Sequence, residues 1–525
     1  MKNKIFALEV VLLMLATWSC REESDLLQTY DHNDNLVFGK AEKSFAAKFQ
    51  VMWNGMSQYY TLWDYEAEQG VDWDAIYDEY YPQFAALDQR GDDETVTDDE
   101  LYALMLKVLG PLHDGHFIFY MKNHKTGNKV VVFPNKERNQ TRDDYTQAID
   151  FSPNLSYYAN PANNKIETNA NGNRICIEYS TRLLDLLTPI FNTPGIGYKW
   201  IKAKIKELEA LSTPTEMQAF QLEQLKELQS KLIEFVNNDS DIRIYNDLLA
   251  RYSFLNVPGF DYIDSGFDNM GIRLVYALLK DNIAYFHVSG FYMSAYLNDS
   301  QSAVVFDMSN PATKNHVQQM KQVWQAWFDA IQQLHKAGTL KGIIIDVRSN
   351  GGGFTNDYQY CVGALLPEGG YQLGYLRGKR GYGRFDYSTM MPFTAKTMST
   401  PHEVIDDIPV VILTNCKSVS MSEMSTLGVK KMPNGTVIGK RTWGGLCPLA
   451  SNEYNSYNYS GYIGVEGVTP VYGYVPTLAA FTLDKKPIES QGIEPDIEVN
   501  LDPTLLSTGI DSQLEEAIQF IRPGN

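Results

Sequence analysis

The chain has 525 residues, enough for about two to four structural units with sizeable hydrophobic cores. Its hydrophobic fraction of 44% and charged fraction of 21% are typical of a globular protein. The formal net charge of -19 repels nucleic acid, so no nucleic-acid partner is expected.

The N-terminal segment 1–20 predicts export. Lys2 and Lys4 precede a short apolar stretch that is too brief for a membrane span. The stretch ends in TWSC, which resembles a bacterial lipobox and implies cleavage and lipidation at Cys20, with an ordinary secretory signal as the alternative. The following REESD is similar to the tether of some lipoproteins of the Bacteroidetes. We therefore expect an outer-membrane lipoprotein in the cell envelope of a Gram-negative bacterium, periplasmic or surface-exposed, bound to the membrane through Cys20.

Helical periodicity begins after a linker at residues 21–39 and predicts an N-terminal helical domain over residues 40–124. Its segment TDDELYALMLKVLG opens with a capping box of Thr97 and Glu100 and closes on Gly110. The alternation in HFIFY then predicts a strand that begins at His116.

Residues 125–280 form an insertion region. Within it, Lys199 to Phe235 predict a charged, leucine-rich helical hairpin. The region shows no recognisable carboxylate-binding loop of a PDZ domain, so the sequence gives no support for recognition of substrate C-termini.

Residues 281–525 read as an α/β core. The strand-like IAYFHVSGF, the helix-like VQQMKQVWQAWFDAIQQLHKAG and the strand-like KGIIIDVRS predict a right-handed parallel unit. PVVILTN adds a further buried strand.

Two stretches of this core carry residues suited to catalysis. GIIIDVRSNGGGFT is a buried strand followed by three glycines, whose backbone N–H groups can converge on an oxyanion. TNCKSVSMSEM places three serines on alternating positions between a strand and a helix. Such a turn exposes the residue at the bend and directs the helix N-terminus at developing negative charge.

DVRSNGGG, SVSMSE, TVIGKRTWGG and GIEPDIEV, in this order, resemble the tail-specific or C-terminal processing serine peptidases of the S41 family. The resemblance implies a ClpP/crotonase-like S41 core with an N-terminal helical domain and a helical-hairpin insertion. It assigns Ser420 as the nucleophile, and the N–H of Met421, with that of Gly352 or Gly353, as the oxyanion hole.

The proton acceptor departs from the lysine of the bacterial processing branch, because Gly445 stands where that lysine is expected. GKRTWGG is instead similar to the tricorn-like branch, which uses histidine. This similarity implies His116 as the base and Glu489 as the carboxylate that orients it. His113 stays a possible base from the sequence alone, and a variant that recruits Lys440 or Lys417 also stays open.

No CxxC or Cys/His spacing suggests zinc, and neither a cofactor nor a metal is expected. Cys176, Cys361, Cys416 and Cys447 are too scattered for a disulfide scaffold. The preferred hypothesis is an exported, lipid-anchored serine endopeptidase that cleaves peptide or protein substrates through an acyl-enzyme. The alternative is a non-catalytic peptide- or ligand-binding lipoprotein on the same fold.

Overall fold

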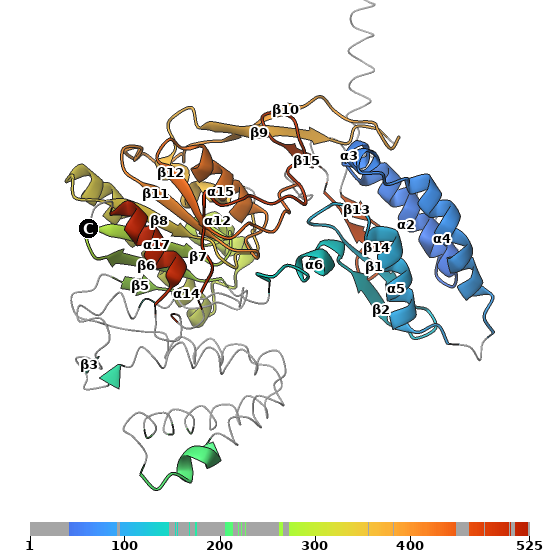
Figure 1. The fold of residues 1–525 in the computed structure, drawn as a ribbon, viewed down its shortest axis with the longest axis horizontal. Coiled ribbons are helices and arrows are strands. Elements are labelled where there is room, and N and C mark those ends of the chain that lie inside the picture. Colours follow the sequence, from blue (N-terminus) through green and yellow to red (C-terminus); the bar gives the residue numbers. More distant parts are fainter. Residues whose placement is uncertain are drawn as a thin grey trace, which may run out of the picture. The chain divides into compact units, whose positions relative to one another are not determined.

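A computed structural model describes residues 41–91, 95–145, 272–354, 356–381, 383–447, 461–476, 478–502 and 510–522, with short stretches between 153 and 271 and residue 505. The predicted signal segment with Cys20, the predicted linker, Cys176 and most of the expected hairpin lie outside these residues. The chain divides into two compact units (Figure 1). The first unit comprises Met1–Arg138, Gly374–Phe393 and Gly445–Ser490, and the second comprises Asn139–Leu373, Thr394–Gly444 and Gln491–Asn525.

The first unit contains the predicted N-terminal helices. They are α2 (Phe45–Tyr59), α3 (Trp63–Glu68), α4 (Trp73–Asp88) and α5 (Asp98–Leu109), and the short α6 (Pro134–Asn139) follows beyond the predicted helical domain. Helix α2 packs on α4, where the rings of Phe49 and Phe84 stack with centroids 4.7 Å apart. The predicted cap of α5 is confirmed, since the hydroxyl of Thr97 accepts the N–H of Glu100 at 3.2 Å and Gly110 follows the helix.

A four-stranded sheet completes most of the first unit. Its order is β13 (Tyr462–Ile463), β14 (Val471–Tyr474), β1 (Ile118–Lys122) and β2 (Lys129–Val132). The prediction that β1 begins at His116 is wrong by two residues. Asp114 Oδ1 accepts the N–H groups of His116 at 2.6 Å and Phe117 at 2.8 Å, which removes both donors from the strand ladder.

A second sheet has the order β10 (Met391–Ala395), β9 (Tyr371–Gly378) and β15 (Leu478–Phe481). Strand β15 runs antiparallel to β9. Within the first unit, the guanidinium of Arg377 in β9 binds both carboxylate oxygens of Asp64 in α3 at 2.6 and 2.7 Å.

The second unit is built on a seven-stranded sheet. Its order is β16 (Ile497–Glu498), β12 (Gly435–Gly439), β11 (Val410–Thr414), β8 (Gly342–Asp346), β7 (Ile283–Val288), β6 (Leu274–Leu279) and β5 (Tyr262–Asp264). Strands from β16 to β7 are parallel, and β6 and β5 are antiparallel. The predicted parallel unit is confirmed, because α14 (Pro311–Lys336) connects β7 to its parallel neighbour β8.

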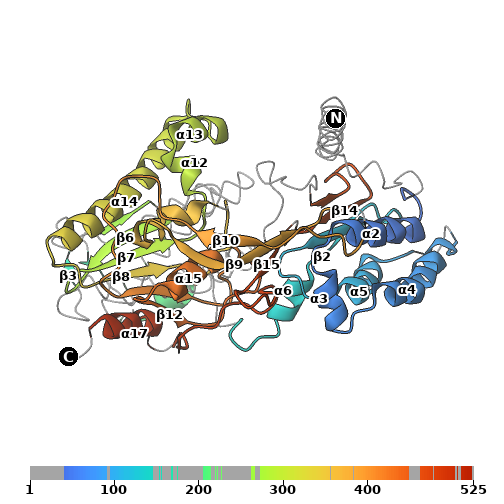
Figure 2. The same cartoon turned by 90° about the horizontal axis from the view of Figure 1, so that it is seen from above.

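Helices cover both faces of this sheet (Figure 2). Phe286 in β7 stacks on Trp327 of α14, with ring centroids 4.4 Å apart. Its neighbour Tyr285 belongs to a buried cluster that includes Leu514 and Ile518 of α17 (Ser512–Ile521). Because successive strand residues point to opposite faces, α14 and α17 lie on opposite faces. The predicted mixed α/β class with an N-terminal helical region is confirmed.

The Asp-Val-Arg motif at the end of β8 is part of the sheet's support. Arg348 is 1% exposed and binds Asp346, and it also binds Asp511 at the start of α17. Burial opposes ionisation of Asp346, but the charge of Arg348 holds its pKa below the ordinary value. Arg348 therefore fastens α17 to the strand that leads into the glycine loop.

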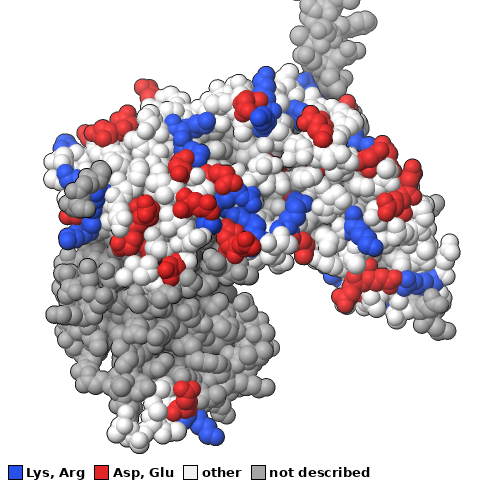
Figure 3. Space-filling view, in the orientation of Figure 1, with Lys and Arg blue, Asp and Glu red and all other residues white. Residues whose placement is uncertain are grey.

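Smaller elements complete the second unit. They are α12 (Met293–Leu297), α13 (Asp299–Val305), the 3-10 turns at Asp357–Tyr360 and Gly363–Leu365, α15 (Met421–Lys431), and the strand pair β3 (Glu167–Thr168) and β4 (Arg174–Ile175). Among the described residues, every helix is too short or too polar to cross a membrane. On the face drawn in Figure 3, acidic and basic side chains are interspersed over the described surface.

Candidate functional site: a serine turn and a histidine loop

The serine turn connects β11 to α15 in the second unit. Ser420 lies directly before the first residue of α15, with φ 59° and ψ -112°. A serine with positive φ is strained, and such strain is characteristic of a sharp strand-to-helix turn that presents a nucleophile. Ser420 is partly exposed. The predicted strand–turn–helix is therefore present at this position.

The other two serines of the alternating set are inside the protein. Ser418 and Ser422 are both 0% exposed. Their hydroxyl groups donate to the backbone carbonyls of Val347 and Asn350, each at 2.8 Å. They fasten the serine turn to the loop after β8 and leave Ser420 as the member of the set with an accessible side chain.

Glu423 holds the backbone of the strained residue. This carboxylate is 0% exposed, and its Oε2 accepts the N–H of Ser420 at 3.1 Å. Its Oε1 accepts the hydroxyl of Thr442 at 2.6 Å and the N–H of Gly444 at 2.8 Å. Three donors satisfy this buried carboxylate, and they tie the serine turn to the loop after β12.

The glycine loop after β8 lies against the serine turn. Gly352 has φ 95°, and a Cβ added there would lie 2.6 Å from the Cβ of Ser420 and 3.1 Å from the nitrogen of Met421. Gly353 has φ 150°, and a Cβ there would lie 2.1 Å from the carbonyl oxygen of Phe291. Both glycines are required by this close approach.

The predicted oxyanion donors differ in whether their N–H groups already donate a hydrogen bond. Met421 is the first residue of α15, so its N–H has no acceptor within the helix and lies at the positive end of the helix dipole. The N–H of Gly352 already donates to Asn350 Oδ1 at 2.8 Å. The N–H of Gly353 has no hydrogen-bond acceptor among the described residues. In this conformation Asn350 competes with an oxyanion for the Gly352 donor.

The histidine loop is part of the first unit, where the structure brings two predicted residues together. The His116 Nδ1 lies 3.6 Å from Glu489 Oε1, and the side chains are 9% and 0% exposed. Glu489 Oε1 also accepts the N–H of Gly115 at 2.8 Å, and its Oε2 accepts those of Leu446 at 2.9 Å and Cys447 at 2.7 Å. The carboxylate is thus fixed by backbone donors beside the imidazole.

Asp114 is a third ionisable group of this loop, and it was not predicted as a site residue. Burial, and then the charge of Glu489, raise the pKa of Asp114 to about 7, while the charge of His116 opposes the rise. Its Oδ2 accepts no hydrogen bond from any described residue. The only sequence signal was its position two residues before the histidine, which suits a turn that holds the N–H of His116.

Arg138 supports the same loop from α6. Its guanidinium donates to the carbonyl oxygens of Gly110 at 3.0 Å, Leu112 at 2.5 Å and Asp114 at 3.0 Å. No sequence signal marks this role, because these acceptors are backbone groups more than twenty positions away.

The alternative bases have other partners. His113 Nδ1 lies 2.8 Å from Glu66 Oε2. Lys440 donates to Glu498 at 2.5 Å and to Asn500 at 2.9 Å. The ammonium of Lys417 lies 5.7 Å from the ring centroid of Tyr145. In the described part of the chain, no group of three or more His, Cys, Asp or Glu residues is placed to hold a metal ion.

A strained serine at a helix N-terminus lies beside a glycine loop, and this part of the chain is also similar to known proteins. Residues 314–499 match the family model for peptidase family S41. The Tricorn protease of Thermoplasma volcanium is 27% identical over 185 residues, which cover 34% of this chain and 14% of that protein. Tricorn protease homolog 1 of Streptomyces coelicolor is 28% identical over 200 residues, which cover 37% and 15%.

Among solved structures, a putative peptidase from Parabacteroides merdae is 17% identical, with 91% of this chain and 97% of that chain covered and a TM-score of 0.45. The family match over residues 314–499 agrees with the resemblance to S41 peptidases that the sequence motifs carry. The chain spans about one seventh of the length of the tricorn proteases that it matches.

Proposed function

We propose that this protein is a serine endopeptidase that cleaves peptide or protein substrates through an acyl-enzyme. The observation that carries the proposal is the positive-φ Ser420 at the start of α15, with the Met421 N–H and the Gly352 backbone beside it. Glu489, held by three backbone N–H groups beside the His116 ring, supports histidine as the base.

The proposed reaction has two stages, formation of the acyl-enzyme and its hydrolysis. Ser420 Oγ attacks the scissile carbonyl carbon while His116 takes the hydroxyl proton, and the new oxyanion binds the Met421 N–H and a glycine N–H. Collapse breaks the C–N bond, and His116 returns the proton to the leaving amine. Water then attacks the ester carbon and its proton passes to His116. Collapse breaks the ester C–O bond, His116 returns the proton to Ser420 Oγ, and the acid product leaves.

Ser420→Ala tests this proposal. We expect loss of casein or peptide cleavage and loss of labelling by a fluorophosphonate, with an almost unchanged melting temperature. Ser309→Ala, at an exposed turn of the second unit, is the matched control and should cleave and label like the wild type. Retained turnover in Ser420→Ala contradicts the proposal. A folded wild-type protein that neither labels nor cleaves supports instead the ligand-binding lipoprotein.

We also propose export and anchoring through a lipid on Cys20, supported by Lys2, Lys4 and the TWSC sequence. Expressed in a Gram-negative host, the wild type should incorporate radiolabelled palmitate and sediment with membranes. Cys20→Ala should do neither. Palmitate incorporation that persists in Cys20→Ala would contradict the assignment.

A further inference from the structure

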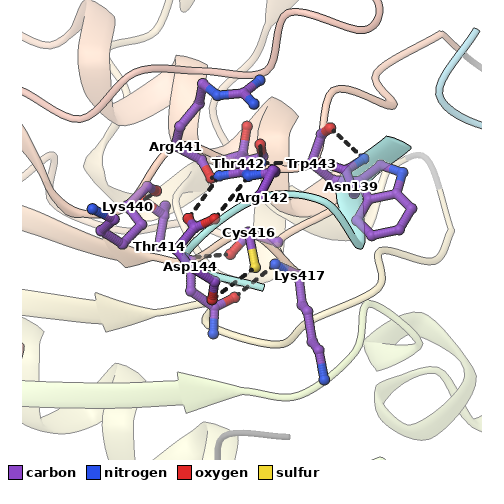
Figure 4. Close-up of polar contacts among 12 residues, drawn as sticks. Asn139, Arg142, Asp144, Thr414, Cys416, Lys417, Lys440, Arg441, Thr442 and Trp443 are labelled. Carbon is purple, nitrogen blue, oxygen red and sulfur yellow. Dashed lines mark hydrogen bonds and ion pairs between the residues drawn. The ribbon is translucent and has the colours of Figure 1, made fainter. Parts of the chain in front are cut away.

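Residues 139–144 bind a row of backbone carbonyls in the second unit (Figure 4). The guanidinium of Arg142 donates to the carbonyl oxygens of Arg441 at 2.7 Å and Thr442 at 2.9 Å. The side-chain amide of Asn139 donates to the carbonyl oxygen of Trp443 at 3.3 Å. Three consecutive carbonyls of one loop are therefore bound from the same segment.

Asp144 fixes the orientation of the guanidinium. Its carboxylate oxygens accept from Arg142 Nε at 2.9 Å and from a terminal nitrogen at 2.8 Å. The two side chains are 12% and 13% exposed. Arginine suits this position because its planar fork binds a carboxylate on one edge and has donors left for carbonyls.

The opposite side of the same peptide groups faces the serine turn. A trans peptide directs its C=O and N–H in opposite directions. The peptide that gives the Thr442 carbonyl to Arg142 gives the Trp443 N–H to the carbonyl oxygen of Ser418 at 3.0 Å. The next peptide gives the Trp443 carbonyl to Asn139 and the Gly444 N–H to Glu423.

Glu423 completes the connection, because the carboxylate that accepts the Gly444 N–H also accepts the N–H of Ser420. From these contacts we infer that Arg142 is a positioning residue for Ser420. Arg142 orients the peptide groups of residues 441–444. These peptide groups hold the Glu423 carboxylate in place. The carboxylate then holds the strained backbone of Ser420. This inference rests on the proposed function for its catalytic consequence but not for its structural part.

The test compares Arg142→Lys and Arg142→Ala with the wild type. A lysine ammonium keeps the charge but cannot form the fork with Asp144 and two carbonyls together. We expect kcat and the rate of fluorophosphonate labelling to fall about tenfold or more in both variants, with KM nearly unchanged, since the serine is misplaced rather than the substrate lost. Millimolar guanidinium should restore part of the activity of Arg142→Ala.

Arg90→Ala is the matched control, because Arg90 forms a similar fork with Glu100 in the first unit. We expect its kcat to stay within about twofold of the wild type, as for an exposed ion pair. An Arg142→Ala variant that matches the wild type in kcat and labelling overturns the inference. The inference is also overturned if the activity of Arg142→Ala falls in proportion to its folded fraction and guanidinium does not restore it.

Amide hydrogen exchange separates this inference from the proposed function. Arg142→Ala should speed exchange in the peptide that covers residues 418–424 at native pH, whether or not the protein is a peptidase. Unchanged exchange there overturns the inference. Faster exchange in a chain whose wild type neither labels nor cleaves supports the positioning contacts and overturns the proposed function alone.

Discussion

Two histidines of one loop each lie beside a buried glutamate, and the comparison shows what separates a structural pair from a candidate base. The His113 ring is 2.8 Å from Glu66, and its side chain is 32% exposed. Glu66 also accepts the His113 N–H and the Tyr60 hydroxyl, both at 2.7 Å. This carboxylate therefore binds its histidine through both the ring and the backbone.

Glu489 is bound differently. Its three short hydrogen bonds come from the backbone N–H groups of Gly115, Leu446 and Cys447, and the His116 ring lies further away, at 3.6 Å. Its position does not depend on the imidazole. A carboxylate fixed in this way can stabilise the imidazolium when it forms, whereas Glu66 is part of a local hydrogen-bond network. A neighbouring glutamate alone does not identify a base.

The largest expected difference in kcat/KM is between the variants that lack His116 and His113. We expect His116→Ala to lower kcat/KM about 1,000-fold or more, because the serine proton loses its acceptor. His113→Ala should lower the free energy of unfolding by about 1–3 kcal/mol, since it leaves Glu66 with fewer partners. Its kcat/KM per folded molecule should be unchanged. Steady-state kinetics and denaturant unfolding of both variants measure the difference, and reversed kinetic effects would make His113 the base.

The carboxylates give the next comparison. Glu489→Gln keeps the volume but removes the charge beside His116, and it places an amide NH2 near N–H donors. We expect kcat/KM to fall on the order of 100-fold, with KM little changed. Glu66→Gln should lower stability and leave the kinetics of folded protein almost intact. If Glu489→Gln and Glu66→Gln lowered kcat/KM equally, the backbone contacts of Glu489 would not distinguish it as the catalytic carboxylate.

The sequence predicted the elements that depend on local pattern. The apolar runs of β7, β8 and β11, the helix α14 between them and the cap of α5 at Thr97 follow from periodicity and capping chemistry. The three serines at a strand-to-helix turn follow from the same signals, and the family resemblance singled out Ser420 among them. The family resemblance brought Glu489 into the prediction. Periodicity could not do so, because Glu489 lies 374 positions after Gly115, whose N–H it accepts.

The supporting contacts could not be predicted in this way. Arg138 and Arg142 bind backbone carbonyls, and a carbonyl is the same in every residue, so no side-chain pattern marks it. Asp114 was not predicted as a site residue. Its raised pKa depends on burial and on Glu489, which come together only in the folded first unit.

Asp114 gives a smaller, pH-dependent effect. Its pKa of about 7 in the folded protein exceeds the ordinary value of 3.8, so between these values the native state binds more protons than the unfolded state. Stability from this group is therefore present below about pH 4 and is lost as the pH rises to about 7. Asp114→Asn should abolish this loss, so its stability relative to the wild type should increase over that range and level off above it.

Denaturant unfolding of Asp114→Asn and the wild type at a series of pH values measures this effect, with Glu68→Gln as an exposed control carboxylate on the same unit. Parallel pH curves for Asp114→Asn and the wild type would contradict the assignment. The variant keeps an Oδ1 acceptor for the His116 N–H, so we expect kcat/KM to change only a few-fold.

The smallest effect is expected for the lysines that could replace the histidine as base. Lys440 is held by Glu498 and Asn500, and Lys417 lies against the Tyr145 ring. We expect Lys440→Ala and Lys417→Ala to keep kcat/KM within about twofold of the wild type, because an exposed ion pair or a cation–π contact contributes about 1 kcal/mol or less. A loss of 100-fold or more in either variant, together with an active His116→Ala, would move the proton acceptor from the histidine loop to that lysine.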